Sequence, residues 1–117
     1  MGFGEAITAG FQNYVNFSGR SQRSAFWWWA LFTAILAIVA AAVDGMLETV
    51  IVYPIVVLGF LLPNLAVQIR RLHDTDRSGW FILLSFIPLV GAIILLVWYC
   101  QKGTEGANRF GADPLAA

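Results

Sequence analysis

The charged stretch from Arg70 to Trp80, RRLHDTDRSGW, contains the residues of this sequence best suited to chemistry. Within eight consecutive positions it carries three arginines, two aspartates and the only histidine of the chain. A histidine beside a carboxylate suits general-base catalysis, and its side chain titrates near neutral pH. Guanidinium groups bind phosphates with bidentate geometry, so binding of a lipid headgroup is a second candidate function.

The rest of the chain gives little support for catalysis or metal binding. A zinc site needs three or four protein ligands, and the sequence offers one histidine and one cysteine, Cys100. It contains no phosphate-binding loop, dinucleotide-binding fingerprint or zinc-protease motif. We therefore predict no catalytic residue, no metal and no cofactor. An interfacial enzyme using His73 and Asp74 is kept as an alternative.

The overall composition favours a membrane protein. Of the 117 residues, 59% are hydrophobic and 12% are charged, and the mean hydropathy is +0.73. Soluble domains have about a quarter charged residues, and one this small could not bury so much apolar surface. The formal net charge is zero, which gives no basic field that would favour nucleic acid as a partner.

Three uncharged segments are long enough to cross about 30 Å of hydrocarbon as helices. They are residues 26–43, 49–69 and 80–100. We expect the first to be a retained helix, because signal peptides have apolar regions of only about 7–15 residues and rarely open on three tryptophans. The sequence therefore predicts an all-α membrane protein with three transmembrane helices.

Two further segments complete the predicted single membrane domain, residues 1–117. Apolar side chains recur at every fourth position near the start of the chain, at Phe3, Ile7, Phe11 and Val15. This spacing predicts an amphipathic helix over residues 3–17 lying in the membrane interface, or else packed on another part of the protein. Residues 101–117 are rich in glycine and are predicted to form a short polar tail with tight turns.

The distribution of positive residues predicts the orientation, because short loops rich in Lys and Arg stay in the cytoplasm. Arg20 and Arg23 precede the first span, and three more arginines follow the second. The hairpin between these spans contains Asp44 and Glu48 but neither Lys nor Arg. We therefore expect the N-terminus and the Arg70–Arg77 stretch to face the cytoplasm.

The side of the tail depends on the third apolar segment. About 21 residues at a rise of about 1.5 Å fit one crossing, so we expect residues 80–100 to span the membrane fully. That crossing would export Lys102 and Arg109, against the charge rule. The alternative is that Pro88 and Gly91 break the segment into a re-entrant element, which would return the tail to the cytoplasm.

Much of the charge in the quoted stretch also has a structural explanation. Arg70 and Arg71 are placed to reach the headgroups from the end of the second helix. In a helical turn, Asp74 would pair with Arg70 and with Arg77. The functional candidate is an interfacial site for anionic lipid headgroups, made of Arg20, Arg23, Arg70, Arg71, His73, Asp74 and Arg77.

Two helix faces inside the predicted spans also stand out. Asn64, Gln68 and Arg71 share one face of the second helix, which predicts either interhelical hydrogen bonds or the wall of a polar path. Small residues form a strip along the first helix, at Ala30, Ala34, Ala37 and Ala41. Such a strip lets helices approach closely, within the chain or in a homo-oligomer.

Four motifs, in this order, resemble those of the domain-of-unknown-function 805 family: FSGRSQRSAFWWW, LPNLAVQIRRLHDTDRSGW, IPLVG and GTEGANRFGADP. The family consists of small bacterial inner-membrane proteins, including the YhaH-type proteins. The resemblance extends from about Phe11 to Pro114. It implies a helical plasma-membrane protein of a family without a settled biochemical activity. In the tail, the residues that match the motifs are Gly106, Asn108, Arg109, Phe110 and Gly111.

The function predicted from these observations is that of a non-enzymatic membrane module. It would engage the bilayer, anionic lipids, a second copy or another membrane protein through its helix faces and interfacial arginines. The main alternative is a subunit of a small oligomeric transporter or channel, because three helices are too few to enclose a wide path alone.

Overall fold

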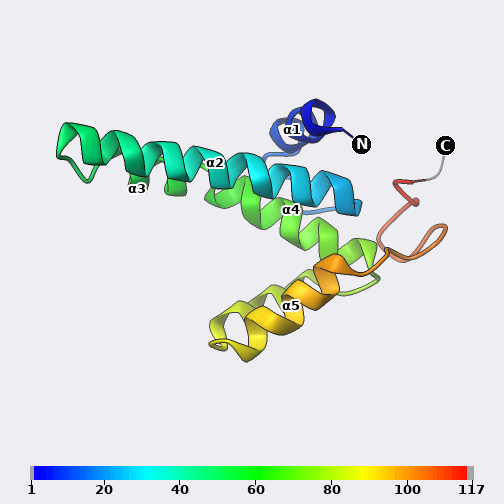
Figure 1. Cartoon of the computed structure of the whole chain (residues 1–117). Coiled ribbons are helices and arrows are strands. Elements are labelled where there is room, and N and C mark those ends of the chain that lie inside the picture. Colours follow the sequence, from blue (N-terminus) through cyan, green and yellow to red (C-terminus); the bar gives the residue numbers. More distant parts are fainter. Residues whose placement is uncertain (1, 116–117) are drawn as a thin grey trace.

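The structure, a computed structural model, describes residues 2–115, which form an all-helical fold (Figure 1). In chain order the elements are α1 (Phe3–Gln12), α2 (Arg23–Leu47), α3 (Val52–Gly59), α4 (Leu61–Asp74), the 3-10 helix η1 (Gly79–Phe86) and α5 (Val90–Cys100). No strand occurs within the described residues, so the predicted all-α class is confirmed.

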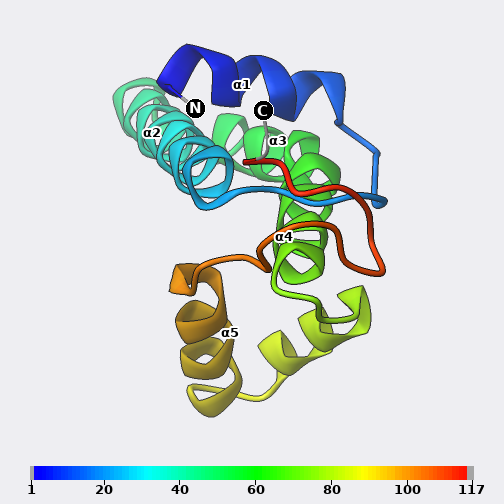
Figure 2. The same ribbon diagram turned by 90° about the vertical axis from the view of Figure 1, so that its right-hand side faces the viewer.

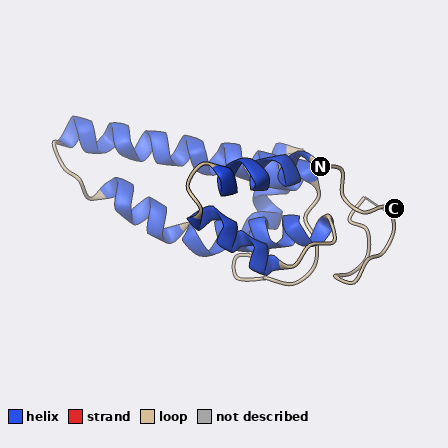
Figure 3. Ribbon diagram, turned by 90° about the horizontal axis from the view of Figure 1, so that it is seen from below, coloured by secondary structure: helices blue, strands red, loops and turns tan. Residues whose placement is uncertain are grey.

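Helix α2 and the pair α3–α4 form a long antiparallel hairpin (Figures 1 and 3). Two helical stretches in the described residues are long and apolar enough to cross a membrane, Arg23–Leu47 and Val52–Asp74. The first contains the predicted span 26–43, and the second overlaps the predicted span 49–69 but begins three residues later. Each is longer than predicted, and the second continues as a helix through the charged residues as far as Asp74.

The junction between α3 and α4 follows from Pro63. Proline has no N–H to donate, and its ring crowds the carbonyl four residues earlier, which is that of Gly59. That carbonyl accepts a hydrogen bond from the Tyr14 hydroxyl, in the segment that links α1 to α2. A tertiary contact therefore satisfies the carbonyl that Pro63 leaves without its helical partner.

Asp44 closes the opposite end of the hairpin. Its carboxylate accepts backbone N–H bonds from Val52 at 2.9 Å and from Tyr53 at 2.8 Å, and the Thr49 hydroxyl donates to it at 2.7 Å. The first N–H groups of a helix have no partner within the helix, and a nearby carboxylate satisfies them. Asp44 of α2 thus caps the start of α3.

Helix α1 runs across α2 rather than along it, as Figures 1 and 2 together show. The Phe11 ring meets Trp29 of α2 at a centroid distance of 5.3 Å and Phe60 at 6.0 Å. The helix ends at Gln12, earlier than the predicted residue 17. Its apolar face therefore packs on α2 and on the junction between α3 and α4, which is the packed alternative considered above.

The third apolar segment does not form one helix, so the prediction of a single helix over residues 80–100 is wrong. The chain reverses at Pro88 and Leu89, between η1 and α5. Gly91 lies so close to the Leu84 carbonyl oxygen that any side chain there would collide with it. The Phe81 and Trp98 rings also meet, at 5.3 Å between centroids. Residues 79–100 thus form a helical hairpin.

Both ends of this hairpin lie at the same end of the molecule as the end of α4 (Figure 1). The tail after α5 and the segment before α2 are found there too (Figures 1 and 2). The buried hydrophobic core lies between α2, α4 and α5, and consists of Phe26, Trp29, Val67, Leu72, Leu95 and Tyr99. The fold therefore gathers segments distant in sequence at one end.

Candidate functional site

Asp74, the last residue of α4, is the centre of a buried ionic network at this end. Its carboxylate accepts hydrogen bonds from Arg20 Nε at 3.0 Å and from Arg71 Nη1 at 2.5 Å. The exposed fractions of the side chains are 3% for Asp74, 1% for Arg20 and 0% for Arg71. The helix dipole disfavours an acidic group at a helix C-terminus, so the two arginines must compensate this charge.

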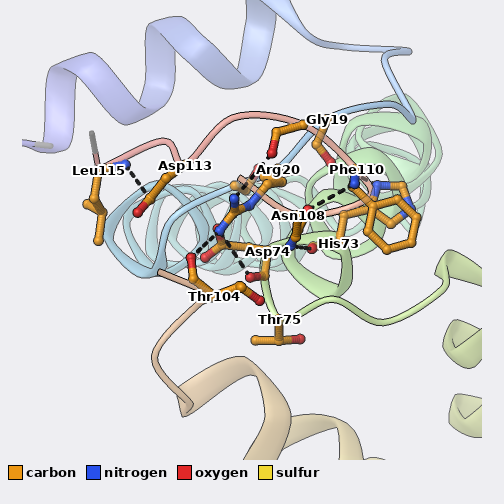
Figure 4. A network of polar contacts seen from close by, with 12 residues as sticks. Gly19, Arg20, His73, Asp74, Thr75, Thr104, Asn108, Phe110, Asp113 and Leu115 are labelled. Carbon is orange, nitrogen blue, oxygen red and sulfur yellow. Dashed lines mark hydrogen bonds and ion pairs between the residues drawn. The ribbon is translucent and has the colours of Figure 1, made fainter. Parts of the chain in front are cut away.

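The guanidinium group of Arg20 joins Asp74 to the tail (Figure 4). Its Nη2 donates to the Thr104 carbonyl at 2.5 Å and to that of Asp74 at 3.4 Å. Its Nη1 donates to the carbonyl oxygens of Gly106 at 2.6 Å and Gly111 at 3.4 Å. Every nitrogen of Arg20 therefore has an acceptor within the protein.

Arg71 joins the same carboxylate to the end of α5 and to the segment before α2. Its Nε donates to the Tyr99 carbonyl at 3.1 Å and its Nη2 donates to that of Gln101. Its Nη1 also donates to the Ser21 carbonyl at 3.3 Å. Arg71 is thus fully used in holding three segments together.

The tail approaches Asp74 closely because residue 103 has no side chain. A Cβ at Gly103 would collide with the Asp74 carboxylate. The next residue, Thr104, donates its N–H to the Asp74 carbonyl at 2.7 Å. That bond satisfies one of the carbonyl groups left free at the end of α4.

His73 lies under the tip of the tail. Its Nδ1 is 2.8 Å from the Gly19 carbonyl, and its ring stacks on Phe110 with a centroid distance of 4.0 Å and an interplanar angle of 4°. Asn108 donates from Nδ2 to the His73 carbonyl at 2.9 Å. A tight turn holds these groups in place, with backbone bonds in both directions between Asn108 and Gly111.

The outer part of the tail makes weaker, exposed contacts. Arg109 Nε lies 3.3 Å from an Asp76 carboxylate oxygen, and Arg109 Nη2 donates to the Asp76 carbonyl at 3.1 Å. Asp113 accepts the N–H groups of Leu115 and Gly106, at 2.9 and 3.0 Å. These backbone bonds, that from Leu115 first, lower the pKa of Asp113.

The three remaining arginines lie around this network. Arg23 is exposed and donates from Nη1 to the Cys100 carbonyl at 3.3 Å. Arg77 stacks on the Trp98 ring at 4.4 Å, and burial lowers its pKa. Arg70 is buried and donates from Nε to the Ala66 carbonyl at 3.3 Å.

These positions correct part of the predicted chemistry. Among the described residues, Asp74 pairs with Arg20 and Arg71 instead of the predicted Arg70 and Arg77. The expectation that Arg70 and Arg71 reach the headgroups is also wrong, because both residues are buried. The donors of Arg20 and Arg71 already have protein acceptors and Arg70 is buried, so of the predicted arginines a headgroup site could draw only on Arg23 and Arg77.

The three residues of the predicted intramembrane polar face, Asn64, Gln68 and Arg71, do not line one common surface. Asn64 and Gln68 line a groove between α2 and α3–α4. Asn64 Oδ1 accepts from Trp29 Nε1 at 2.9 Å, and the Tyr99 hydroxyl is 3.3 Å from Gln68 Oε1. Arg71 points into the ionic network instead.

Several members of the site were not predicted from the sequence. Gly103 and Thr104 lie within the quoted tail motif but were not singled out, although GT followed by NRFG marks a turn-rich segment. Ser21 and Tyr99 contribute only backbone carbonyls to Arg71. No side-chain pattern could have indicated those two.

Comparison with known proteins identifies the family. The family model described as "Protein of unknown function (DUF805)" matches residues 14–112. Inner membrane protein YhaI of Escherichia coli (strain K12) is 47% identical over 108 residues, covering 88% of this chain and 89% of YhaI. Inner membrane protein YhaH of the same strain is 46% identical over 112 residues, covering 88% and 90%.

A more distant relative, Uncharacterized protein YiiR of the same strain, is 26% identical over 125 residues, covering 84% of this chain and 85% of YiiR. No solved structure matches this chain. The family model covers most of the ionic network and the tail motif, and the two similar relatives are named as inner membrane proteins. This chain therefore belongs to the DUF805 family and is a bacterial inner-membrane protein.

Proposed function

We propose that this protein is a non-enzymatic interaction module of the inner membrane that holds a phospholipid in the groove between α2 and α3–α4. The chain would cross the membrane twice, as α2 and as α3–α4. The N-terminus, the ionic network and the tail would then face the cytoplasm, as the arginine distribution favours. Helix α1 would remain packed on α2 near the cytoplasmic surface of the membrane, and the 79–100 hairpin would be re-entrant.

The groove has the shape and chemistry for one acyl chain. It has a volume of about 440 Å³, and small residues of α2 form one wall. These are Ala30, Ala34 and Ala37 of the predicted alanine strip. The opposite wall consists mainly of apolar side chains of α3 and α4, among them Val56, Val57 and Leu61. An acyl chain would fill this space without leaving a void between the helices.

The polar end of the groove carries the observation that favours a phospholipid. Asn64 and Gln68 both use their carbonyl oxygens to accept protein hydrogen bonds, so their amide N–H groups remain to donate. Ester carbonyls of a lipid are acceptors of the required kind. Arg23 lies one turn before Phe26, which lines the groove, and its exposed guanidinium suits a phosphate.

The structural role of Arg20 and Arg71 supports the non-enzymatic assignment. Arg20 and Arg71 donate to protein oxygens throughout. Their partner Asp74 accepts from both, so it does not offer a free base. We therefore assign the ionic network a structural role, in which it fixes the positions of the groove and of the 79–100 hairpin.

Native mass spectrometry of the purified protein tests the lipid. We expect the wild-type chain to retain phospholipid, and Ala34→Leu, which fills the groove, to lose it. The matched control is Ala42→Leu, because Ala42 is exposed on α2 and lies outside the groove. Arg23→Gln should weaken retention of anionic lipids relative to zwitterionic ones.

Retention of the same lipids by Ala34→Leu and Ala42→Leu would contradict the proposal. A lipid-free dimer that Ala34→Leu disrupts would instead assign the groove to a second copy of the chain.

A transporter or channel subunit is the second candidate, because Asn64 and Gln68 present amide N–H groups inside the membrane region. Such a subunit would have to oligomerise around these side chains. Ion or solute flux in reconstituted liposomes that Asn64→Leu abolishes would support it. Liposomes without flux, together with a lipid-bound monomer in mass spectrometry, would exclude it.

A further inference from the structure

We infer that His73 forms a second binding site, for a small neutral ligand that combines an apolar body with one O–H or N–H group. The site lies at the interface of α4, η1 and the tail, away from the groove between α2 and α3–α4. It is a cavity of about 320 Å³ with largely apolar walls. The residues that line it with His73 include Ile69, Gly79, Trp80, Leu83 and Phe110.

Hydrogen bonding fixes which nitrogen of His73 is available to a ligand. The Gly19 carbonyl, 2.8 Å from Nδ1, can only accept a hydrogen bond, so Nδ1 carries the hydrogen. In the neutral imidazole, Nε2 then bears a lone pair and is an acceptor. No described residue donates a hydrogen bond to Nε2, and this atom is not fully buried, so it is accessible from the cavity.

The direction of Nε2 is toward the cavity. A Cβ placed on Gly79, which lines the cavity, would lie 3.5 Å from Nε2. Phe110 stacks on one face of the imidazole, and Asn108 binds the His73 backbone, so the ring is held in this orientation (Figure 4). His73 as a whole is only 8% exposed.

The ligand class follows from this geometry. Nε2 is an acceptor without a protein donor at an apolar cavity, so a ligand that donates one hydrogen bond complements it. The aromatic and aliphatic walls would bury the rest of the ligand. A volume of about 320 Å³ is at the lower end of ordinary small-molecule sites.

The only histidine of the chain provides a direct test. The full-length protein, purified without a histidine tag and placed in lipid nanodiscs, would be labelled with ¹⁵N-histidine. Indole and N-methylindole serve as probes, because they share a ring system and only indole has an N–H to donate. We expect indole to move the Nε2 resonance upfield saturably, and to bind about fivefold more tightly than N-methylindole.

Two variants retain the ¹⁵N-labelled His73 as the reporter and narrow the cavity. Gly79→Ala would place a methyl group against Ile69 and near Nε2. Leu83→Trp would narrow the cavity at a position that is half exposed in the wild type, so folding should be preserved. Both should weaken indole binding, whereas Gly59→Ala, with open space around it, should not.

Three results would overturn the inference. They are an Nε2 resonance that indole does not move, an equal response to the two probes, and unchanged indole binding by Leu83→Trp. Each of them leaves the lipid groove untouched, because none of the varied residues lines it.

Discussion

At the scale of single residues, the charges in the Arg70–Arg77 stretch serve mainly to hold the protein together. Asp74 accepts from two buried arginines, one of which comes from 54 positions earlier in the chain. Their charge and their place in the quoted motifs made these residues recognisable from the sequence. Their pairing could not be predicted, because local helical spacing favours Arg70 and Arg77, whereas the folded chain brings Arg20 to Asp74.

Replacing Asp74 by Asn should be strongly destabilising, because it leaves Arg20 and Arg71 buried without a counter-charge. Removing one partner of a buried ion pair costs about 3–5 kcal/mol. Thermal unfolding in detergent, followed by circular dichroism, measures this loss. The matched control is Glu105→Gln, which removes the exposed ion pair with Lys102 and should leave the unfolding temperature unchanged. Equal unfolding temperatures for the two variants would contradict the buried network.

Gly103→Ala should release the tail while leaving the helices in place, since its methyl group would collide with the Asp74 carboxylate. Limited trypsin digestion measures the effect as faster cleavage after Arg109. Gly4→Ala is the control, because an added Cβ at Gly4 meets no atom within 4 Å. Cleavage at wild-type rates in Gly103→Ala would show that the tail does not pack on Asp74.

At the scale of elements, the sequence predicted the two long helices and failed on the third apolar segment. A run of about 21 apolar residues satisfies the length criterion for a crossing, and a folded hairpin satisfies the same criterion. Pro88 and Gly91 indicated the break, but their effect depends on contacts such as that between Gly91 and the Leu84 carbonyl. Such contacts exist only once η1 and α5 have folded together.

Asp44 provides the test at this scale, because it caps α3 from the end of α2. Asp44→Ala should lower the unfolding temperature, since several N–H groups at the start of α3 lose their acceptor. Asp44→Asn should fall between wild type and Asp44→Ala, because an amide keeps one acceptor oxygen. Glu48→Ala is a neighbouring control that should have little effect. Equal effects of Asp44→Ala and Glu48→Ala would contradict the cap.

At the scale of the whole molecule, the polar motifs of the described residues lie at one end, apart from the acidic turn around Asp44 and Glu48. The segment before α2, the end of α4 and the tail meet around Arg20, Asp74 and His73. The groove is lined by Asn64 and Gln68 of α4, whereas the His73 cavity is lined by Ile69 and His73 of the same helix. In a membrane, this arrangement requires the tail and the Arg70–Arg77 stretch to face the same side.

The side of the tail is the most direct test of this account. Cys100 would be replaced by Ser, a single cysteine placed at the exposed Ala107, and spheroplasts treated with a membrane-impermeant thiol reagent. A single cysteine at Met46, exposed at the far end of α2, serves as the control that should label in intact spheroplasts. We predict that Ala107→Cys labels only after permeabilisation. Labelling of Ala107→Cys in intact spheroplasts, like that of Met46→Cys, would contradict both the re-entrant hairpin and the single polar end.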